Sequence, residues 1–448
     1  QKINVFEMNL PIDFIRATKE LLGEEWGSFD SALNSSAPTS IRYNNKIEIP
    51  TSPSFEKVAW CETAFYLEER PSFTFDPLFH SGVYYVQEAS SMFLEQIVKQ
   101  FVKQQVVALD LCAAPGGKST HLIDLLPQGS VLISNEINRQ RAYILSENIQ
   151  KWGNENCIVT NNAPADFERY QGLFDFILVD APCSGEGMFR KDPNSIDEWS
   201  LKNVENCVSR QRDILSKIWG TLKEDGILVY STCTYTRSEN EENIQWLKDT
   251  FSAEILSVKC EPKWNIFQNE YGCRFFPHRT KGEGFFISAL RKKTFEKTIK
   301  LKSLNFPKVN NKELLKYLKK DDQFTIFSLQ DILYAVPKDM DILVQNFAKN
   351  NTILHAGIEF AQQKGRDFLP QSGLALSKSI DLTQINVCDV DKEIAIRFLQ
   401  KENISINSEK GFVLISYQNV PLGWVKNLGN RSNNLYPKEW RIRNKQVF

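Results

Sequence analysis

The sequence predicts an α/β fold, in which a parallel sheet covered by helices lies between a small accessory module and a β-rich region. Between about residues 96 and 290, short apolar runs alternate with helical patterns, which is typical of parallel strands joined by crossover helices. Beyond Lys300 the pattern changes to short strand-like pieces. A chain of 448 residues also exceeds what one hydrophobic core usually serves. We therefore expect four segments, at 1–95, 96–295, 296–375 and 376–448.

The first segment is expected to be a small accessory module. It has apolar residues with helical spacing, which predict a short amphipathic helix: Phe14, Leu21, Leu22 and Trp26. A turn-rich stretch follows before residues 40–44.

Four buried strands and two helices are predicted in the second segment. The strands are the short apolar runs 106–111, 131–135, 175–180 and 226–230. Before the last of them, apolar residues from Ile214 to Leu222 recur with helical spacing, and Gly226 then marks a break. A capping box at 238–241 predicts another helix, which would run through Ile244.

The carboxyl-terminal part is predicted to be rich in strands and to end in a basic tail. Strand-like pieces occur at 324–329 and 332–336, and the runs 411–417 and 422–426 predict a β-hairpin. From Lys426 to Lys445 there are six Lys or Arg against one Glu. Two aromatic residues, Tyr436 and Trp440, lie among these cations. This combination suits contact with phosphates and stacking on bases, and a core position for the aromatic side chains is the alternative.

Composition narrows the class of protein. Lys and Arg number 54 against 55 Asp and Glu, so any surface for a polyanion must be a local patch. The nine cysteines form no C-x-x-C pair, which argues against a disulfide framework and a zinc knuckle. No apolar run has the length of a membrane span, and the amino terminus shows no signal-peptide pattern. We expect a soluble cytoplasmic monomer with no bound metal and no membrane partner.

A turn of small residues between a predicted strand and a predicted helix is the first candidate binding site. It runs from Cys112 to Lys118, where the backbone can approach an anionic or nucleotide-like ligand at the start of the helix. A P-loop would need its first glycine at the position of Cys112, so an NTPase is disfavoured. The next strand ends at Glu136, and an acid there can accept both hydroxyls of a ribose.

Two cysteines follow buried strands and are the second candidate site. Cys183 comes three residues after Asp180, and Cys233 follows the strand at 226–230. The carboxyl ends of parallel strands are where open α/β sheets bind ligands. Such thiols suit the methylation of a pyrimidine carbon, because thiolate addition at carbon 6 makes carbon 5 nucleophilic. Asp180 could hydrogen-bond the exocyclic amine and stabilise charge, or supply a proton, at ring nitrogen 3.

The motifs at 112–118, 180–187 and 231–234 resemble those of the RNA 5-methylcytosine methyltransferases, which include bacterial Sun proteins and eukaryotic nucleolar relatives. The resemblance implies a Rossmann-like class I methyltransferase domain at 96–295 that uses S-adenosyl-L-methionine. It also implies that Cys233 is the nucleophile and that Cys183 assists product release. Relatives often carry an Asp near the end of the third strand, for which Asn162 is the nearest substitute. The implied cofactor residues are Cys112, Ala113, Ala114, Pro115, Gly116, Gly117, Lys118, Glu136, Asn162 and Asp180.

The flanking segments at 84–92, 422–426 and 434–437 resemble the RsmF (YebU-like) branch, whose members modify small-subunit ribosomal RNA. This implies an RNA-binding accessory module at 1–95, a linker and intermediate α/β segment at 296–375, and a PUA-like RNA-binding domain at 376–448. Ribosomal RNA is the expected partner, and transfer RNA is the runner-up. Two further classes stay open at this point. One is a DNA cytosine methyltransferase, in which the Pro-Cys thiol would attack, and the second is a catalytically silent RNA-binding protein for ribosome assembly.

Overall fold

The computed structural model describes residues 8–46, 56–295, 297–304, 309, 312–329, 331–365 and 367–444. The described residues form four sheets, and the largest has ten strands. None of their helices is long and apolar enough to cross a membrane. Lys445, the last cation of the predicted basic tail, lies outside the described residues.

The central sheet has the strand order β11-β12-β13-β9-β8-β5-β6-β7-β16, with β10 also paired to β13. Its strands are β5 (Val107–Asp110), β6 (Val131–Asn135), β7 (Cys157–Thr160), β8 (Phe174–Asp180), β9 (Leu222–Thr232), β10 (Glu254–Leu256), β11 (Phe267–Asn269), β12 (Gly272–Phe275), β13 (Phe285–Arg291) and β16 (Ile353–Ala356). The five strands from β9 to β7 are parallel, and the remaining pairings are antiparallel. Four of the five are the predicted strands, and β7 was not among them.

Helices cover both faces of this sheet because its strands are apolar on both faces. They are α4 (Leu94–Phe101), α5 (Gly117–Leu125), α6 (Arg139–Trp152), α8 (Leu201–Trp219) and α9 (Glu241–Phe251). The short helix α7 (Asn194–Glu198) does not cover the sheet, and its Ile196 packs in the cluster that contains Phe14. Alternate residues of β5 show the division: Ala108 packs in the cluster that contains α4 and α5, whereas Leu109 packs in the cluster that contains α8 and α9.

Two local predictions in this region are wrong. Leu222 begins β9 and does not extend the preceding helix, which ends at Trp219. The helix predicted from the capping box does form, but Ser238 does not cap it. Its N-cap is Asn240, which makes no side-chain capping bond, because its amide binds Thr232 and the Thr234 carbonyl instead.

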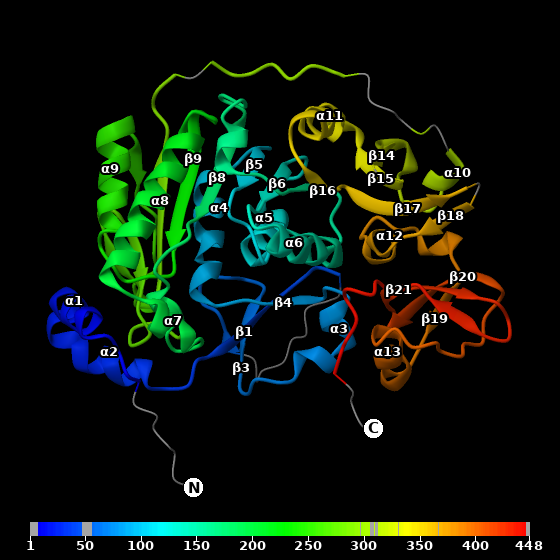
Figure 1. The fold of residues 1–448 in the computed structure, drawn as a ribbon, viewed down its shortest axis with the longest axis horizontal. Coiled ribbons are helices and arrows are strands. Elements are labelled where there is room, and N and C mark those ends of the chain that lie inside the picture. Colours follow the sequence, from blue (N-terminus) through cyan, green and yellow to red (C-terminus); the bar gives the residue numbers. More distant parts are fainter. Residues whose placement is uncertain are drawn as a thin grey trace, which may run out of the picture.

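The N-terminal module consists of a small antiparallel sheet and three helices. Its elements are α1 (Ile12–Leu22), α2 (Trp26–Leu33), β1 (Thr39–Tyr43), β2 (Glu56–Lys57), β3 (Ala64–Leu67), α3 (Pro77–His80) and β4 (Tyr84–Val86). The predicted amphipathic helix forms as α1, but it ends at Leu22, and Trp26 begins α2. Phe14 of α1 is buried against Phe189 and Trp199. In Figure 1 this module (blue) lies along the lower side of the central sheet.

The rest of the chain adds two further sheets and one strand of the central sheet. The first sheet, in the order β14-β15-β17-β18, is accompanied by α10, α11 and α12. Its elements are α10 (Lys312–Leu315), β14 (Phe324–Leu329), β15 (Ile332–Pro337), α11 (Asp341–Asn350), β17 (Ile358–Lys364), β18 (Asp367–Pro370) and α12 (Ser372–Leu376). Between them, β16 pairs with β7, so this segment is continuous with the central sheet.

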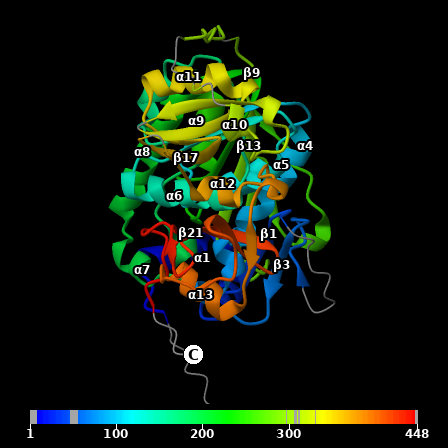
Figure 2. The ribbon, with the colours of Figure 1, turned by 90° about the vertical axis from the view of Figure 1, so that its right-hand side faces the viewer.

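The last sheet, in the order β19-β20-β21-β22, contains the predicted hairpin. Its elements are β19 (Val387–Asp389), α13 (Lys392–Leu399), β20 (Gly411–Tyr417), β21 (Val420–Asn427) and β22 (Ser432–Asn434). Tyr436 is fully buried in the core beside this sheet, so it cannot stack on a base, and Trp440 packs against it. Val420 of β21 belongs to the same hydrophobic cluster as Ile41 and Tyr43 of β1, and Figure 2 shows the last sheet (orange to red) from the side.

Candidate active site

The loop between β5 and α5 has the shape expected for the edge of a binding site. Gly116 has φ +118°, a conformation that residues with a side chain rarely adopt, and it immediately precedes the first turn of α5. From α6, Arg141 Nη2 donates to the carbonyl of Ala114 at 2.7 Å, and Asn148 Nδ2 donates to the carbonyl of Pro115 at 2.7 Å. The loop is thus held from behind, with its other side open to a cavity.

This cavity has a volume of about 480 Å³ and joins the loop to Cys233. It contains most of the site residues predicted from the sequence: Cys112, Ala113, Ala114, Pro115, Gly117, Lys118, Asp180 and Cys233. Parts of the wall come from the N-terminal module and its continuation, namely residues 38–40, Arg70, residues 85–88 and Ser91. Both the methyltransferase segment and the N-terminal module therefore form the cavity wall. The sequence motifs predicted only the part from the methyltransferase segment.

The two cysteine side chains lie against each other at the carboxyl ends of β8 and β9. Their Sγ atoms are 3.1 Å apart, and the backbone N–H of Cys233 donates to Cys183 Sγ at 3.3 Å. Both are free thiols. The hydrogen bond with Cys233, together with burial, raises the pKa of Cys183 well above its usual value. Cys183 therefore stays a protonated thiol beside Cys233, which faces the cavity.

The carboxylate of Glu186 joins the two cysteine loops. It accepts hydrogen bonds from Thr234 Oγ1 at 2.7 Å, the backbone N–H of Tyr235 at 2.8 Å and Thr236 Oγ1 at 2.6 Å. Trp199 Nε1 donates to the same carboxylate at 2.9 Å. Because a buried carboxylate with this many donors is costly to move, Glu186 fixes the loop after Cys183 relative to the loop after Cys233.

Gly187 marks the closest approach of these loops. Its N–H donates to the carbonyl of Cys233 at 2.8 Å. A Cβ placed on Gly187 would lie 2.3 Å from the carbonyl oxygen of Gly284 and 2.9 Å from that of Cys233. Both neighbours are backbone atoms, which cannot rotate away as the end of a side chain could.

We expect Gly187→Ala to displace Cys233 and to lower the rate of methyl transfer by about 100-fold, since a shift near 1 Å can have an effect of this size. Gly27→Ala is the matched control, because nothing lies within 4 Å of its Cβ position and it should keep full activity. The rate would be measured with labelled cofactor, and thermal unfolding would show that both variants fold. Normal activity of Gly187→Ala would mean that Cys233 need not hold this position.

Asp180 lies in the cavity with both carboxylate oxygens bound by neighbours. Lys118 Nζ donates to its Oδ2 at 2.8 Å, and Ser231 Oγ donates to its Oδ1 at 2.7 Å. Burial lowers the pKa of Lys118, but the attraction and hydrogen bond of Asp180 outweigh burial, so that the pKa is raised. The ammonium therefore stays charged next to the cavity.

Two buried acids near the site were missed. Asp110 ends β5 and lines the cavity; Ser119 Oγ donates to its Oδ2 at 2.6 Å, and its Oδ1 has no hydrogen-bond partner. Burial raises the pKa of Asp110 to about 7, and the charge of Asp180 contributes. Burial also raises the pKa of Glu239 to about 7, and the backbone N–H of Ser184 donates to this carboxyl. Asp110 could have been found from its place in the motif, at a strand end.

Three of the predicted cofactor residues lie apart from the cavity wall. Gly116 is behind the loop, as its contacts with α6 show. Glu136 is buried; its Oε1 accepts from the backbone N–H of Asn138 at 2.9 Å, and its Oε2 lies 3.7 Å from Arg141 Nη1. Asn162 uses its amide within the protein, because Oδ1 accepts from the backbone N–H of Thr352 at 3.0 Å and Nδ2 donates to Asp166 at 3.2 Å.

Arg42 attaches the N-terminal module to the helix behind the cofactor loop. Its side chain is fully buried and stacks on the ring of Trp152. The guanidinium donates to Thr120 Oγ1 at 2.6 Å, to Gln87 Oε1 at 2.9 Å and to Asp124 Oδ2 at 3.3 Å. The planar guanidinium group of Arg42, with its several N–H donors, thus holds β1 and β4 against α5. This contact places residues 85–88 in the wall of the cavity.

Removal of this guanidinium should be strongly destabilising. We expect Arg42→Ala to lower the free energy of unfolding by about 3 kcal/mol, because it leaves buried acceptors and a carboxylate without a donor. Arg16→Ala is the matched control; that side chain is 76% exposed and pairs only with Asp13, so its loss should cost less than about 1 kcal/mol. Urea unfolding of both variants measures the difference, and equal midpoints would show that Arg42 is not an anchor.

Comparison with known proteins identifies this arrangement. The family model of 16S rRNA methyltransferase RsmB/F matches residues 98–291. The N-terminal domain of 16S rRNA methyltransferase RsmF matches residues 10–89, and the methyltransferase RsmF PUA domain matches residues 385–442. Ribosomal RNA small subunit methyltransferase F of Shewanella loihica is 31% identical over 418 residues, which are 86% of this chain and 83% of that protein.

The chain belongs to the ribosomal RNA small subunit methyltransferase F family. The family member of Psychromonas ingrahamii is similarly close, with 31% identity over 421 residues, 87% of this chain and 86% of the relative. The chain is thus an RNA methyltransferase of the RsmB/F type.

Solved structures agree with this family assignment. A methyltransferase homolog protein from Pyrococcus horikoshii is 29% identical with a TM-score of 0.55, over 63% of this chain and 96% of that chain. NSun6 from Pyrococcus horikoshii with SFG shows the same fold at 21% identity and a TM-score of 0.52, over 63% of this chain and 98% of that chain. The predicted fold class is confirmed: a Rossmann-like methyltransferase domain between an N-terminal module and a PUA domain.

Proposed function

We propose that the protein transfers a methyl group from S-adenosyl-L-methionine to carbon 5 of a cytosine in small-subunit ribosomal RNA, through a covalent bond between Cys233 and the base. The observation that carries this proposal is the pair of thiols, 3.1 Å apart, beside a cavity that also contains Asp180 and the loop after β5. A thiol and a carboxylate in one cavity, with a second thiol in contact with the first, suit cytosine methylation and few other reactions.

The residues at the loop fit the proposed cofactor. Asp110 Oδ1 lacks a partner, and an ammonium group such as that of the methionine part would supply one. The small residues from Cys112 to Pro115 leave the backbone accessible along the cavity. We propose Glu136 for the ribose hydroxyls, since it directly follows β6, the strand next to β5. Asn162 is not included, because both ends of its amide bind the protein. The bound cofactor would supply a sulfonium methyl group.

The first chemical step belongs to Cys233. Its thiolate would add to carbon 6 of the cytosine, forming the sulfur–carbon bond and moving the electron pair of the 5,6 double bond toward carbon 5 and the ring. Carbon 5 then becomes the nucleophile that takes the methyl group. The backbone contacts of Gly187 and Glu186 fix the loop that carries Cys233, so that the thiolate attacks from one position.

Asp180 is proposed to hold the base during this step. Its carboxylate would accept a hydrogen bond from the exocyclic amine. Lys118 at 2.8 Å keeps positive charge next to the same edge of the base, which stabilises the electron density that moves into the ring. Ser231 fixes the direction of the carboxylate through its 2.7 Å hydrogen bond.

Cys183 is proposed to act in release. After methylation, a base takes the carbon 5 proton, the electron pair of that bond restores the 5,6 double bond, and the sulfur–carbon bond breaks to release Cys233 as a thiolate. A protonated thiol in contact with Cys233 Sγ can exchange a proton with it as the sulfur–carbon bond breaks. The raised pKa of Cys183 keeps that proton available.

The choice of ribosomal RNA rests on the family, since the relatives of Shewanella loihica and Psychromonas ingrahamii are named for the small ribosomal subunit. Such a substrate would place the reaction in the cytoplasm. The target cytosine has to be unpaired or flipped out to reach Cys233. Transfer RNA remains the second candidate substrate.

The test is methylation of purified RNAs with the wild-type protein and labelled cofactor. Small-subunit ribosomal RNA, intact small subunits and transfer RNA are offered separately, and each product is mapped by bisulfite sequencing. We expect one ribosomal cytosine to become methylated. Methylation of transfer RNA alone would replace the substrate, and binding without methylation of any RNA would support a catalytically silent protein.

A further inference from the structure

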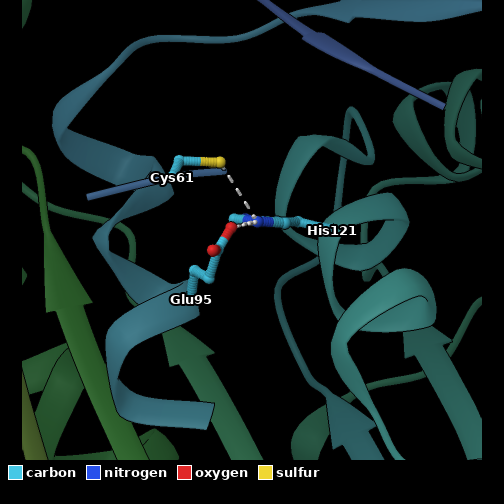
Figure 3. Close-up of side chains that lie close together, drawn as sticks. All are labelled: Cys61, Glu95 and His121. Atoms are coloured by element: carbon cyan, nitrogen blue, oxygen red, sulfur yellow. Dashed lines mark hydrogen bonds and ion pairs between the residues drawn. The ribbon is translucent and has the colours of Figure 1, made fainter. Parts of the chain in front are cut away.

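A second cluster of chemically active side chains lies away from the methylation site. Cys61 of the N-terminal module, Glu95 of α4 and His121 of α5 point toward one another in the interior (Figure 3). Their exposed fractions are 2%, 2% and 1%. Cys61 Sγ is 3.7 Å from His121 Nε2, and the same nitrogen is 3.3 Å from Glu95 Oε2. The three atoms all lie within 4.8 Å of one another.

These separations are close to those between neighbouring ligands of a tetrahedral zinc ion. Zinc binds sulfur at about 2.3 Å and nitrogen or oxygen at about 2.0–2.2 Å, so tetrahedral angles place sulfur about 3.6 Å from nitrogen, and nitrogen about 3.3 Å from oxygen. The observed 3.7 and 3.3 Å differ from these values by about a tenth of an ångström or less. The third pair, Cys61 Sγ and the Glu95 oxygen, lies within 4.8 Å, where tetrahedral zinc would need about 3.6 Å. An ion would therefore require a shift of about 1 Å at most in this one pair.

Without a metal, the Cys61 thiol and the His121 N–H would both donate to the Glu95 carboxylate. A single Nε2 faces both the Cys61 sulfur and the Glu95 oxygen, and one N–H can be donated well to only one of them. If Nε2 carries no proton, its lone pair faces the lone pairs of the carboxylate oxygen, and the two repel each other. His121 Nδ1 has no hydrogen-bond partner, so the ring is held through Nε2. A cation at the centre would satisfy the sulfur, nitrogen and oxygen lone pairs together.

The remaining contacts of Glu95 direct one oxygen into the cluster. Its Oε1 accepts from the backbone N–H of Glu62 at 3.1 Å and from Lys99 Nζ at 2.7 Å. This leaves Oε2 for the side of His121 and Cys61, as a single-oxygen ligand would be placed. Groups that hold a ligand from behind in this way are a common feature of metal sites.

We propose that Cys61, Glu95 and His121 bind one zinc ion. On binding, the Cys61 thiol gives up its proton to solvent, so thiolate and carboxylate together balance the two positive charges of the ion. A fourth ligand would be a water molecule or Thr63, whose Oγ1 is 4.0 Å from Cys61 Sγ. Sulfur, imidazole and carboxylate together favour zinc over magnesium or calcium, which prefer oxygen ligands.

The ion would be a structural clamp. It would join the loop of Cys61 to α4 and to α5, and α5 begins at Gly117 of the cofactor loop. The sequence predicts no metal because it contains no C-x-x-C pair. The three ligands are far apart in the chain, and only the packing of the N-terminal module on α4 and α5 brings them together.

The test uses cobalt as a spectroscopic substitute for zinc in the full-length protein. After dialysis against a chelator, wild-type protein is titrated with Co²⁺. We expect one equivalent to bind, with a thiolate-to-cobalt charge-transfer band and the strong visible absorption of tetrahedral cobalt, both removed by added Zn²⁺. Cys61→Ser should lose the charge-transfer band. Cys388→Ser is the matched control and should keep it, because that half-buried cysteine lies in the last sheet.

Thermal unfolding provides a second readout that does not depend on cobalt. Zn²⁺ should raise the unfolding temperature of the chelated wild-type protein and leave that of Cys61→Ser unchanged. Wild-type protein that binds no cobalt would overturn the proposal and leave a hydrogen-bonded cluster. A charge-transfer band that persists in Cys61→Ser but disappears in Cys260→Ser would also overturn it, since Cys260 and Cys273 form a separate thiol pair with a 3.6 Å separation. None of these results depends on methylation.

Discussion

Cys233→Ala is expected to abolish methyl transfer, with a loss in rate on the order of 10⁴-fold or more, because the addition step then has no nucleophile. The side chain borders the cavity, and its replacement by alanine removes only the sulfur, so the fold and cofactor binding should be unchanged. Methyl incorporation into ribosomal RNA measures the first effect, and equilibrium binding of the cofactor measures the second.

Cys388→Ala is the control for loss of a cysteine far from the site, and it should remain fully active. Activity that survives Cys233→Ala but is lost in Cys183→Ala would exchange the roles of the two thiols. That outcome would match the chemistry of DNA cytosine methyltransferases, in which the thiol of the Pro-Cys position attacks.

Cys183→Ala is expected to trap the protein on its substrate. Addition and methylation can still occur at Cys233, but the thiol in contact with the leaving sulfur is absent, so the covalent complex accumulates. We expect a protein–RNA species that survives denaturing gel electrophoresis, together with a large loss of turnover. The bond should be absent from the double variant that also lacks Cys233. If Cys183→Ala turned over at the wild-type rate without any adduct, Cys183 would have no part in the mechanism.

The catalytic half of the site could be predicted because its residues follow strand ends. Asp180 and Cys233 lie at the carboxyl ends of two neighbouring parallel strands. The alternation of apolar runs and helical patterns predicts such parallel strands, and ligands bind at their carboxyl ends. The loop from Cys112 to Lys118 is equally local, because its small residues lie between one strand and one helix. Each of these residues is placed by the strand directly before it, so its position follows from the local sequence.

The rest of the site depends on contacts between distant segments. Arg42 places the N-terminal module against α5, and residues 85–88 thereby enter the cavity wall, but no local pattern marks an arginine that will be fully buried. The capping box failed for a related reason. Its central residues are drawn into tertiary contacts, since Glu239 binds Ser184 and Asn240 binds Thr232.

The pairing of β16 with β7 also determines whether the central sheet stays soluble when the chain is truncated. A fragment ending after β13 would leave β7 as an open edge strand, and the backbone groups of Ile158 to Thr160 that now face β16 would be unpaired. It would also uncover the apolar surface that Phe347 and Ala356 now bury. Exposed edges flanked by apolar residues recruit other strands. The methyltransferase domain in isolation should therefore aggregate, and its solubility should return when the chain is extended through β16.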